Sequence, residues 1–238
     1  MEQKTEVKQS ARIQTSILNA AEKKVLVWMG ERMPSWVTSD MLTYFGTFGA
    51  IVIALGYYLT NFNIAWLWLA SFGFVLNWFG DSLDGTLARV RKQQRPLYGF
   101  YIDHNIDVIN EAFMIGGAGL SCLMDLRIAL LVLCAYFMIS IYVYINAHLK
   151  GEFKLTYAKL GPTELRLIII IVNTLFFFIR PLQTFCLSLT VLGKNLDLKA
   201  LDIVGLALFV GIICAYLASL YNDGRYFAKL DPLKKKAE

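Results

Sequence analysis

The chain has 238 residues, of which 57% are apolar and 17% are charged, with a formal net charge of +5. A soluble globular domain carries about 25% charged residues, so this composition excludes that class and indicates a single integral membrane domain. The basic excess is better explained by anionic lipid headgroups than by nucleic acid.

The N-terminal part, residues 8–33, has apolar residues at helical spacing, among them Ile13, Ile17 and Val25. This spacing predicts an amphipathic helix, which either lies on the membrane surface or packs on the end of the bundle. Pro34 is expected to end it, and Ser39 or Asp40 to cap the next helix.

Six later segments are apolar and long enough to cross a bilayer, which takes about 20 residues each. They cover residues 41–60, 62–88, 100–125, 128–149, 164–186 and 201–222. The predicted fold is therefore an all-α membrane protein with six transmembrane helices and an N-terminal juxtamembrane helix. Its expected regions are an amphipathic helix in 1–39, the six-helix domain in 40–223 and a basic tail in 224–238.

Basic residues are distributed unevenly about these segments. Nineteen of the 23 Lys and Arg residues fall on one side of the predicted membrane. The positive-inside rule places that side, with both termini, in the cytoplasm of a multi-pass protein. The pattern suits a bacterial inner membrane and an endoplasmic reticulum membrane equally. The four cysteines stand singly in apolar segments, which predicts buried free thiols and no metal or redox role.

Four aspartates lie at the cytoplasmic ends of the second and third predicted spans. Asp81 and Asp84 are three residues apart, and Asp103 and Asp107 are four apart, so each pair shares one helix face. The basic loop between them contains Pro96 and turns the chain back. The two helices are expected to be antiparallel neighbours whose four carboxylates meet.

Four carboxylates near hydrocarbon need compensation, because like charges repel and each buried ion costs several kcal/mol. One or two hard divalent cations would supply it, and oxygen ligands favour Mg²⁺ or Mn²⁺. The alternative is that the aspartates pair with arginines and hold the helices together. Small residues beside them, Gly85, Ala88 and Gly99, leave room for a bulky ligand.

These residues resemble the signature of the CDP-alcohol phosphatidyltransferase family. The matching pattern is Asp81-x-x-Asp84-Gly85-x-x-Ala88-Arg89 followed by Gly99-x-x-x-Asp103-x-x-x-Asp107. One departure is the gap of nine residues between Arg89 and Gly99, where the family usually has eight. The resemblance implies six transmembrane helices, a site facing the cytoplasm and a homodimer.

The resemblance also implies roles for the residues that match. Two Mg²⁺ or Mn²⁺ ions would be held by Asp81, Asp84 and Asp103, with Asp107 beside them as general base and further ligand. The donor-binding residues would be Gly85, Ala88, Arg89 and Gly99.

The implied reaction transfers a substituted phosphoryl group from a CDP-alcohol to an acceptor hydroxyl, releases CMP and belongs to phospholipid biosynthesis. In one form, CDP-diacylglycerol donates a phosphatidyl group to a polar alcohol such as inositol phosphate, glycerol phosphate or serine. Candidate acceptor-binding residues are His104, Glu164, Arg166 and Arg225, with Lys150 and Lys159 as further cations. In the other form, CDP-choline or CDP-ethanolamine donates to a lipid hydroxyl. Asp103-His104-x-x-Asp107 and the pair Thr163-Glu164 resemble that branch.

Other functions remain open from the sequence. His104 and Glu164 also suit ordinary structural roles, Glu164 as an acid at a helix N-terminus. Glu111, four residues beyond Asp107, suits a supporting position or a structural ion pair. A cation transporter would place acids at mid-membrane on several helices, and prenyl-diphosphate chemistry would need denser acidic runs.

Overall fold

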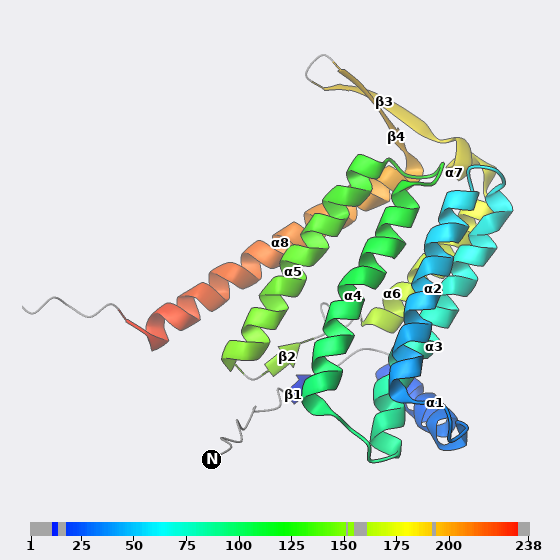
Figure 1. Cartoon of the computed structure of the whole chain (residues 1–238). Coiled ribbons are helices and arrows are strands. Elements are labelled where there is room, and N and C mark those ends of the chain that lie inside the picture. Colours follow the sequence, from blue (N-terminus) through cyan, green and yellow to red (C-terminus); the bar gives the residue numbers. More distant parts are fainter. Residues whose placement is uncertain (1–10, 14–17, 151, 155–160, 192–193, 233–238) are drawn as a thin grey trace, which may run out of the picture.

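The computed structural model describes residues 11–13, 18–150, 152–154, 161–191 and 194–232. The described chain is mostly helical (Figure 1). Its helices are α1 (Asn19–Arg32), α2 (Ser39–Leu59), η1 (Ile64–Trp66), α3 (Leu67–Val90), α4 (Pro96–Gly119), α5 (Leu126–Lys150), α6 (Pro162–Phe178), α7 (Arg180–Thr184) and α8 (Ala200–Leu230).

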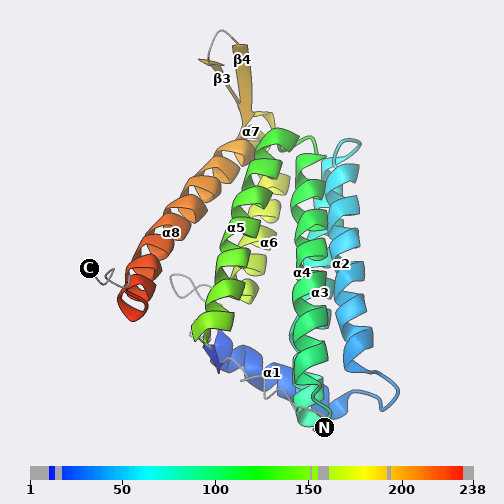
Figure 2. The ribbon, with the colours of Figure 1, turned by 60° about the vertical axis from the view of Figure 1, so that its left-hand side comes forward.

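The long helices form a bundle in which α2 packs along α3 and α4, and α6 packs against α3. Helix α5 lies between α4 and α8, and α8 diverges from the rest toward its C-terminal end (Figures 1 and 2). Helix α1 lies across one end of the bundle, and a β-hairpin projects from the other (Figure 2).

Glycines set the closeness of α2 to α3. A Cβ atom on Gly49 would lie 2.4 Å from the backbone nitrogen of Asn77, and one on Gly80 would lie 2.3 Å from that of Gly46. Such contacts between backbones are typical of helices packed through small residues in membranes. They fix the part of α3 that carries Asp81 firmly against α2.

The interior holds apolar side chains and one polar network. Ile53, Leu67 and Phe74 are buried in the main cluster. The Tyr57 hydroxyl donates to Asn173 Oδ1 at 2.9 Å, and Asn173 Nδ2 donates to Ser71 Oγ at 3.2 Å. This network joins α2, α6 and α3.

Each of the six segments predicted to span a membrane contains one long helix. By length and composition, α2, α5 and α8 are the helices of the described chain that can cross a membrane. Helix α6 ends at Phe178 instead of residue 186, because Pro181 interrupts the helical hydrogen bonding. Helix α3, which corresponds to the second predicted span, begins at Leu67 instead of residue 62, after the 3₁₀ turn η1.

The expectation of an all-α fold is wrong in two places. Strand β3 (Cys186–Val191) pairs antiparallel with β4 (Lys194–Lys199), at the end of the fifth predicted span and between it and the sixth. The alternation of Leu187 and Leu189 with Ser188 and Thr190 is the period-2 pattern of a strand. Strand β1 (Ala11–Ile13) pairs parallel with β2 (Glu152–Lys154). The helix predicted over residues 8–33 therefore begins at Asn19, since Ala11–Ile13 pair with a distant segment.

Helix α1 packs on the bundle, which is the second of its two expected placements. Leu26 is buried in one cluster with Leu83 and Leu87 of α3. On the outer side of α1, Val25 and Trp28 stay exposed. The helix ends before Pro34 as predicted, but the cap of α2 is Thr38, whose hydroxyl accepts from the Met41 N–H.

The cysteines Cys122, Cys134, Cys186 and Cys214 are free thiols, as predicted. Their expected burial is wrong, since all four are exposed on the surface of this chain.

Candidate active site

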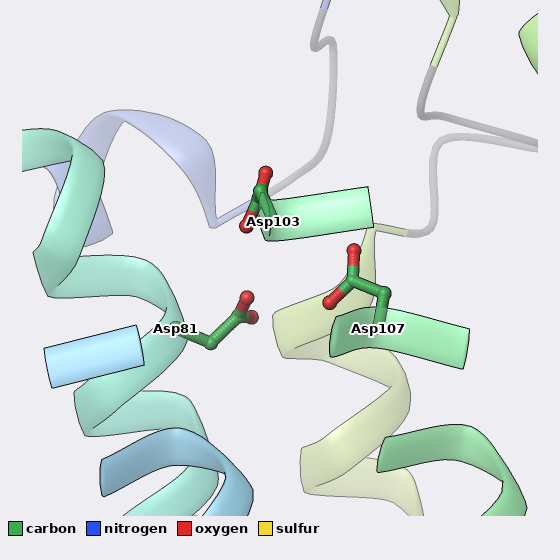
Figure 3. A group of neighbouring side chains, drawn as sticks. All are labelled: Asp81, Asp103 and Asp107. Atoms are coloured by element: carbon green, nitrogen blue, oxygen red, sulfur yellow. The ribbon is translucent and has the colours of Figure 1, made fainter. Parts of the chain in front are cut away.

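Three of the four aspartates converge between α3 and α4. Asp81 comes from α3, and Asp103 and Asp107 come from successive turns of α4 (Figure 3). One carboxylate oxygen of each lies within 4.8 Å of those of the others. The three side chains are only partly buried, so the cluster can be reached from outside the chain.

Asp84 is turned toward α2. Its side chain is buried, and Oδ2 accepts from the Thr43 hydroxyl at 2.6 Å. Its other oxygen accepts from the backbone N–H of Gly85. The structure thus places Asp84 one helical turn from Asp81 but outside the three-carboxylate group, and its role as a metal ligand stays a prediction.

One cation balances part of this negative charge. Arg166 Nη2 on α6 lies 2.5 Å from Asp81 Oδ2. For Asp81, this pair matches the alternative that arginine joins the helices. Arg166 Nη1 is buried and has no hydrogen-bond partner within the described chain. Arg166 thus keeps one terminal nitrogen whose hydrogen-bonding capacity is not used within the described chain.

The donor set fits a hard divalent cation. Three carboxylates this close repel one another strongly unless they are protonated or neutralised, and Arg166 supplies a single positive charge. Oxygen ligands on two facing helices match the preference of Mg²⁺ and Mn²⁺.

The small residues assigned to the donor lie at the same end of the bundle. A Cβ atom on Gly99 would meet no heavy atom within 4 Å, and one on Gly85 would meet only Arg89 Nη1, at 3.4 Å. Arg89 Nη2 donates to the Thr86 hydroxyl at 2.9 Å. Packing within the chain therefore does not require glycine at these two positions, which leaves space for a ligand.

A cleft of about 320 Å³ lies beside Ala88 at the ends of α2 and α3. Its lining includes Asp40 and Arg95, whose side chains form an ion pair. Arg91 anchors the adjacent loop by donating to the carbonyl oxygens of Val37 and Pro34. These two arginines of the basic loop therefore hold the loop to the start of α2.

That loop contains a residue with unusual backbone geometry. Lys92 has a φ angle of 55°, and Gln93 N donates to Ala88 O at 2.9 Å while Lys92 N donates to Arg89 O at 3.1 Å. These bonds form the Schellman motif that ends a helix with one residue in the left-handed region. The turn lies within the stretch that is one residue longer than in the family pattern.

The four candidate acceptor residues occupy different places. Arg166 contacts the cluster. The His104 ring stacks on Phe100 at 4.0 Å, and its Nδ1 lies 2.8 Å from the Phe100 carbonyl oxygen. Glu164 caps α6, since its carboxylate accepts from the Gly161 N–H at 3.0 Å. Arg225 is exposed on the C-terminal half of α8, where Nη1 lies 3.4 Å from the Tyr221 hydroxyl.

Of the two further cations proposed for an acceptor phosphate, the structure describes only Lys150, which forms an ion pair with α8. Lys150 Nζ lies 2.7 Å from Asp223 Oδ1 on α8, and the Tyr142 hydroxyl donates to Asp223 Oδ2 at 2.5 Å. Lys159 lies outside the described residues. Lys150 thus joins α5 to α8.

Two residues near the cluster have partners that the sequence does not show. Tyr136 of α5 hydrogen-bonds Glu111, which lies one turn beyond Asp107 on α4. Glu111 Oε2 is buried and has no partner among the described residues. Nothing in the spacing of Tyr136 indicates this contact.

Comparison with known proteins decides the family. The family model for CDP-alcohol phosphatidyltransferase matches residues 36–194, about two thirds of the chain and all of the acidic motif. The chain belongs to the CDP-alcohol phosphatidyltransferase family. The match covers α2 to α6, the helices that build the carboxylate cluster and carry Arg166.

Relatives within this family have different substrates in their names. The phosphatidylinositol phosphate synthase of Cutibacterium acnes is 34% identical over 84 residues, 35% of this chain and 38% of that protein. The choline/ethanolaminephosphotransferase of Saccharomyces cerevisiae is 29% identical over 212 residues, 82% of this chain and 52% of that protein. The chain thus matches about half or less of the length of these two relatives. The archaetidylinositol phosphate synthase of Pyrococcus horikoshii is 30% identical over 155 residues, 65% of this chain and 78% of that protein.

A solved structure supports the same fold. The crystal structure of Mycobacterium tuberculosis phosphatidylinositol phosphate synthase, with CDP-DAG bound, aligns with a TM-score of 0.56 and 17% identity. The alignment covers 85% of this chain and 92% of that one. At this identity the likeness establishes a shared helical architecture.

Proposed function

We propose that this chain transfers a substituted phosphoryl group from a CDP-linked alcohol to an acceptor hydroxyl and releases CMP, as a step of phospholipid biosynthesis. The observation that carries the proposal is the convergence of Asp81, Asp103 and Asp107 from two helices of the family domain. Neither a transporter nor a structural ion-pair cluster needs the open space at Gly85 and Gly99.

The chain's own residues have defined tasks in this reaction. Asp107 accepts the proton of the acceptor hydroxyl as its oxygen forms a bond to the phosphorus distal to cytidine. The anhydride bond to that phosphorus breaks, and CMP leaves with the bridging oxygen. Two Mg²⁺ or Mn²⁺ ions, bound by Asp81, Asp84, Asp103 and Asp107, would neutralise the diphosphate. The residues otherwise act by positioning and by charge.

The donor would lie with its cytidine against Gly85, Ala88 and Gly99, and with a phosphate near Arg89. Small side chains there allow the nucleotide to approach the backbone. Because Arg91 and Arg95 bind to the start of α2, the loop they belong to serves as a wall of this site.

Our first candidate for the donor is CDP-diacylglycerol, with a polar alcohol as acceptor. Relatives named as inositol phosphate lipid synthases favour it. Arg166 would contact the acceptor, since its Nη1 is buried and unpartnered within the described chain. His104, Glu164 and Arg225 remain candidates for this role as well.

A second candidate is transfer from CDP-choline or CDP-ethanolamine to a lipid hydroxyl. It is favoured by the placement of two cations that a phosphorylated acceptor would need. Lys150 contacts Asp223, and Arg225 contacts Tyr221, so neither forms a cationic pocket with Arg166. An uncharged hydroxyl needs fewer cations than a phosphorylated acceptor does. The relative from Saccharomyces cerevisiae matches more of this chain than the inositol phosphate lipid synthases do.

We also propose that the protein spans the membrane six times and works as a homodimer, with both termini and the site on the cytoplasmic side. Residues 40–223 would form the catalytic domain, preceded by a juxtamembrane region in 1–39 and followed by a basic tail in 224–238. The basic residues around the predicted spans support this orientation.

The test is direct. Purified protein is incubated with CDP-diacylglycerol, CDP-choline or CDP-ethanolamine, each with its acceptors, in Mg²⁺ or Mn²⁺ and in chelator. We expect CMP release and a lipid product with one donor class, and none in chelator. Absence of CMP release with every donor would refute the proposal, and the productive donor separates the two candidates.

A further inference from the structure

Helix α1 is fastened to two helices of the site through one carboxylate. Glu22 Oε1 accepts from Trp78 Nε1 of α3 at 2.8 Å and from the Thr163 hydroxyl of α6 at 2.6 Å. Glu22 is partly buried, in contrast to its exposed neighbours Lys23 and Lys24. A carboxylate that accepts two hydrogen bonds from two helices fixes their separation.

The position of this bridge relates it to the carboxylate cluster. Trp78 precedes Asp81 by three residues on α3, and Thr163 precedes Arg166 by three residues on α6. Residues three apart on a helix share a face. Glu22 therefore joins the same two helices, on the same faces, as the Asp81–Arg166 ion pair.

A second contact holds the first turn of α6. The backbone N–H of Leu18, next to α1, donates to Glu164 Oε1 at 2.8 Å, and the Gly161 N–H donates to Oε2 at 3.0 Å. Glu164 is buried and lies between Thr163 and Arg166 in the sequence. The start of α6 is thus attached to the region of α1 at two adjacent residues.

We propose that Glu22 is a positioning residue, which holds the first turn of α6 against α3 so that Arg166 stays beside Asp81. This inference rests on the proposed function. Glu22 touches no reacting atom and acts through Arg166. Misplacing a substrate-binding group by about 1 Å can lower a rate about 100-fold, so loss of this bridge has a measurable effect.

The test is a double-mutant cycle in steady-state turnover. Glu22→Ala removes both hydrogen bonds and is expected to lower kcat/KM roughly ten-fold, whereas Glu22→Gln keeps an acceptor oxygen and stays within about two-fold. Glu31→Ala, an exposed residue of the same helix, is the matched control and leaves the rate unchanged. In the Arg166→Gln background, Glu22→Ala is expected to have no further effect. An equal loss in both backgrounds would overturn the inference.

The same coupling is measured without substrate. In detergent, Glu22→Ala should lower Tm more in the wild-type background than with Arg166→Gln, and additive shifts would count against the bridge. Coupling in Tm without any CMP release from wild type means that the proposed function fails while the geometry holds. If the wild type releases CMP but the effects of Glu22→Ala and Arg166→Gln are additive, the proposed function holds and the positioning role of Glu22 fails. Thr163→Val, which removes one of the two donors, replaces Glu22→Ala if that variant does not fold.

Discussion

Arg166 Nη2 lies 2.5 Å from Asp81 Oδ2 and joins two helices through residues 85 positions apart in the sequence. The two side chains are largely buried, with 14% and 24% of their surfaces exposed. The arginine compensates one carboxylate, and its second terminal nitrogen, Nη1, is buried with no hydrogen-bond partner among the described residues. The proposed acceptor chemistry depends on this pair.

Replacing Arg166 tests that dependence. Arg166→Gln should lower kcat/KM about 100-fold or more, because a preorganised charged donor at the reacting group is lost. Arg166→Lys should lower kcat/KM by less than Arg166→Gln but should not reach the wild-type value. Lysine lacks the planar guanidinium group that can bind Asp81 and a substrate oxygen at once. Because a competing positive charge is removed, the Mg²⁺ concentration for half-maximal rate should fall in Arg166→Gln. A higher Mg²⁺ requirement would mean that Arg166 orients Asp81 instead.

Asp107→Asn tests the proton acceptor. We expect kcat to fall about 10²–10⁴-fold, the usual contribution of a general base, with donor binding weakened but measurable by equilibrium binding of the CDP-alcohol. Asn105→Ala, an exposed change on the same helix, is the control. Turnover at the wild-type rate in Asp107→Asn would remove the base assignment.

Substitutions of Gly49, Gly99 and Gly116 distinguish a glycine needed for helix packing from one needed for ligand binding. Gly49→Ala must push α2 from α3, and we expect it to destabilise the protein by about 1–3 kcal/mol in thermal unfolding. At Gly99 and Gly116 an added methyl group meets open space, so alanine at either should stabilise α4 by up to about 1 kcal/mol. Gly99→Ala alone should raise the KM for the CDP-alcohol. Equal KM values in Gly99→Ala and Gly116→Ala would show that the nucleotide does not lie against Gly99.

Lys92 provides a test of backbone strain. The left-handed conformation costs a non-glycine residue about 1–2 kcal/mol, and the greater freedom of glycine in the unfolded chain offsets about 0.5–1 kcal/mol of that. Lys92→Gly should therefore stabilise the protein by roughly 0.5–1 kcal/mol. Lys92→Ala keeps the strain and should not. If both variants were more stable than the wild type, the cause would be removal of the lysine charge and not relief of the φ angle.

Asp202 at the other end of the bundle should matter for stability alone. It is fully buried, and its carboxylate accepts from the Lys199 N–H at 2.8 Å and the Asp125 N–H at 2.7 Å. Asp202→Ala leaves two backbone donors without this acceptor and should cost about 1–3 kcal/mol in thermal unfolding. The KM and kcat of the remaining folded enzyme should be unchanged. A selective change in KM would connect this end to the site.

The sequence predicts those parts of the site that depend on spacing within one helix. Asp103 and Asp107 share a face because they are four residues apart, and the basic turn before α4 brings them opposite Asp81. The position of Asp84 depends on Thr43, a residue of another helix, and no spacing shows that contact. The same holds for the bonds of Glu22 to α3 and α6.

The fold divides in a similar way. Apolar stretches locate the six long helices, but their ends depend on local geometry such as Pro181 and the turn at η1. The hairpin of β3 and β4 has a period-2 pattern, which a prediction based only on segment length and hydropathy does not detect. Pairing of Ala11–Ile13 with Glu152–Lys154 is a contact between distant segments, which local periodicity cannot reveal.

Helix α8 has 31 residues, and only 6% of its most apolar stretch is buried within the chain. At 1.5 Å per residue it is about 46 Å long, whereas a bilayer's hydrocarbon is about 30 Å thick. If α8 crosses the bilayer upright, about a third of the helix would extend into the headgroups or beyond, and its last turns carry Asp223, Arg225 and Lys229. The ion pair between Asp223 and Lys150 would then join α8 to α5 near the headgroups, and we expect lipid mixtures of different thickness to change its strength.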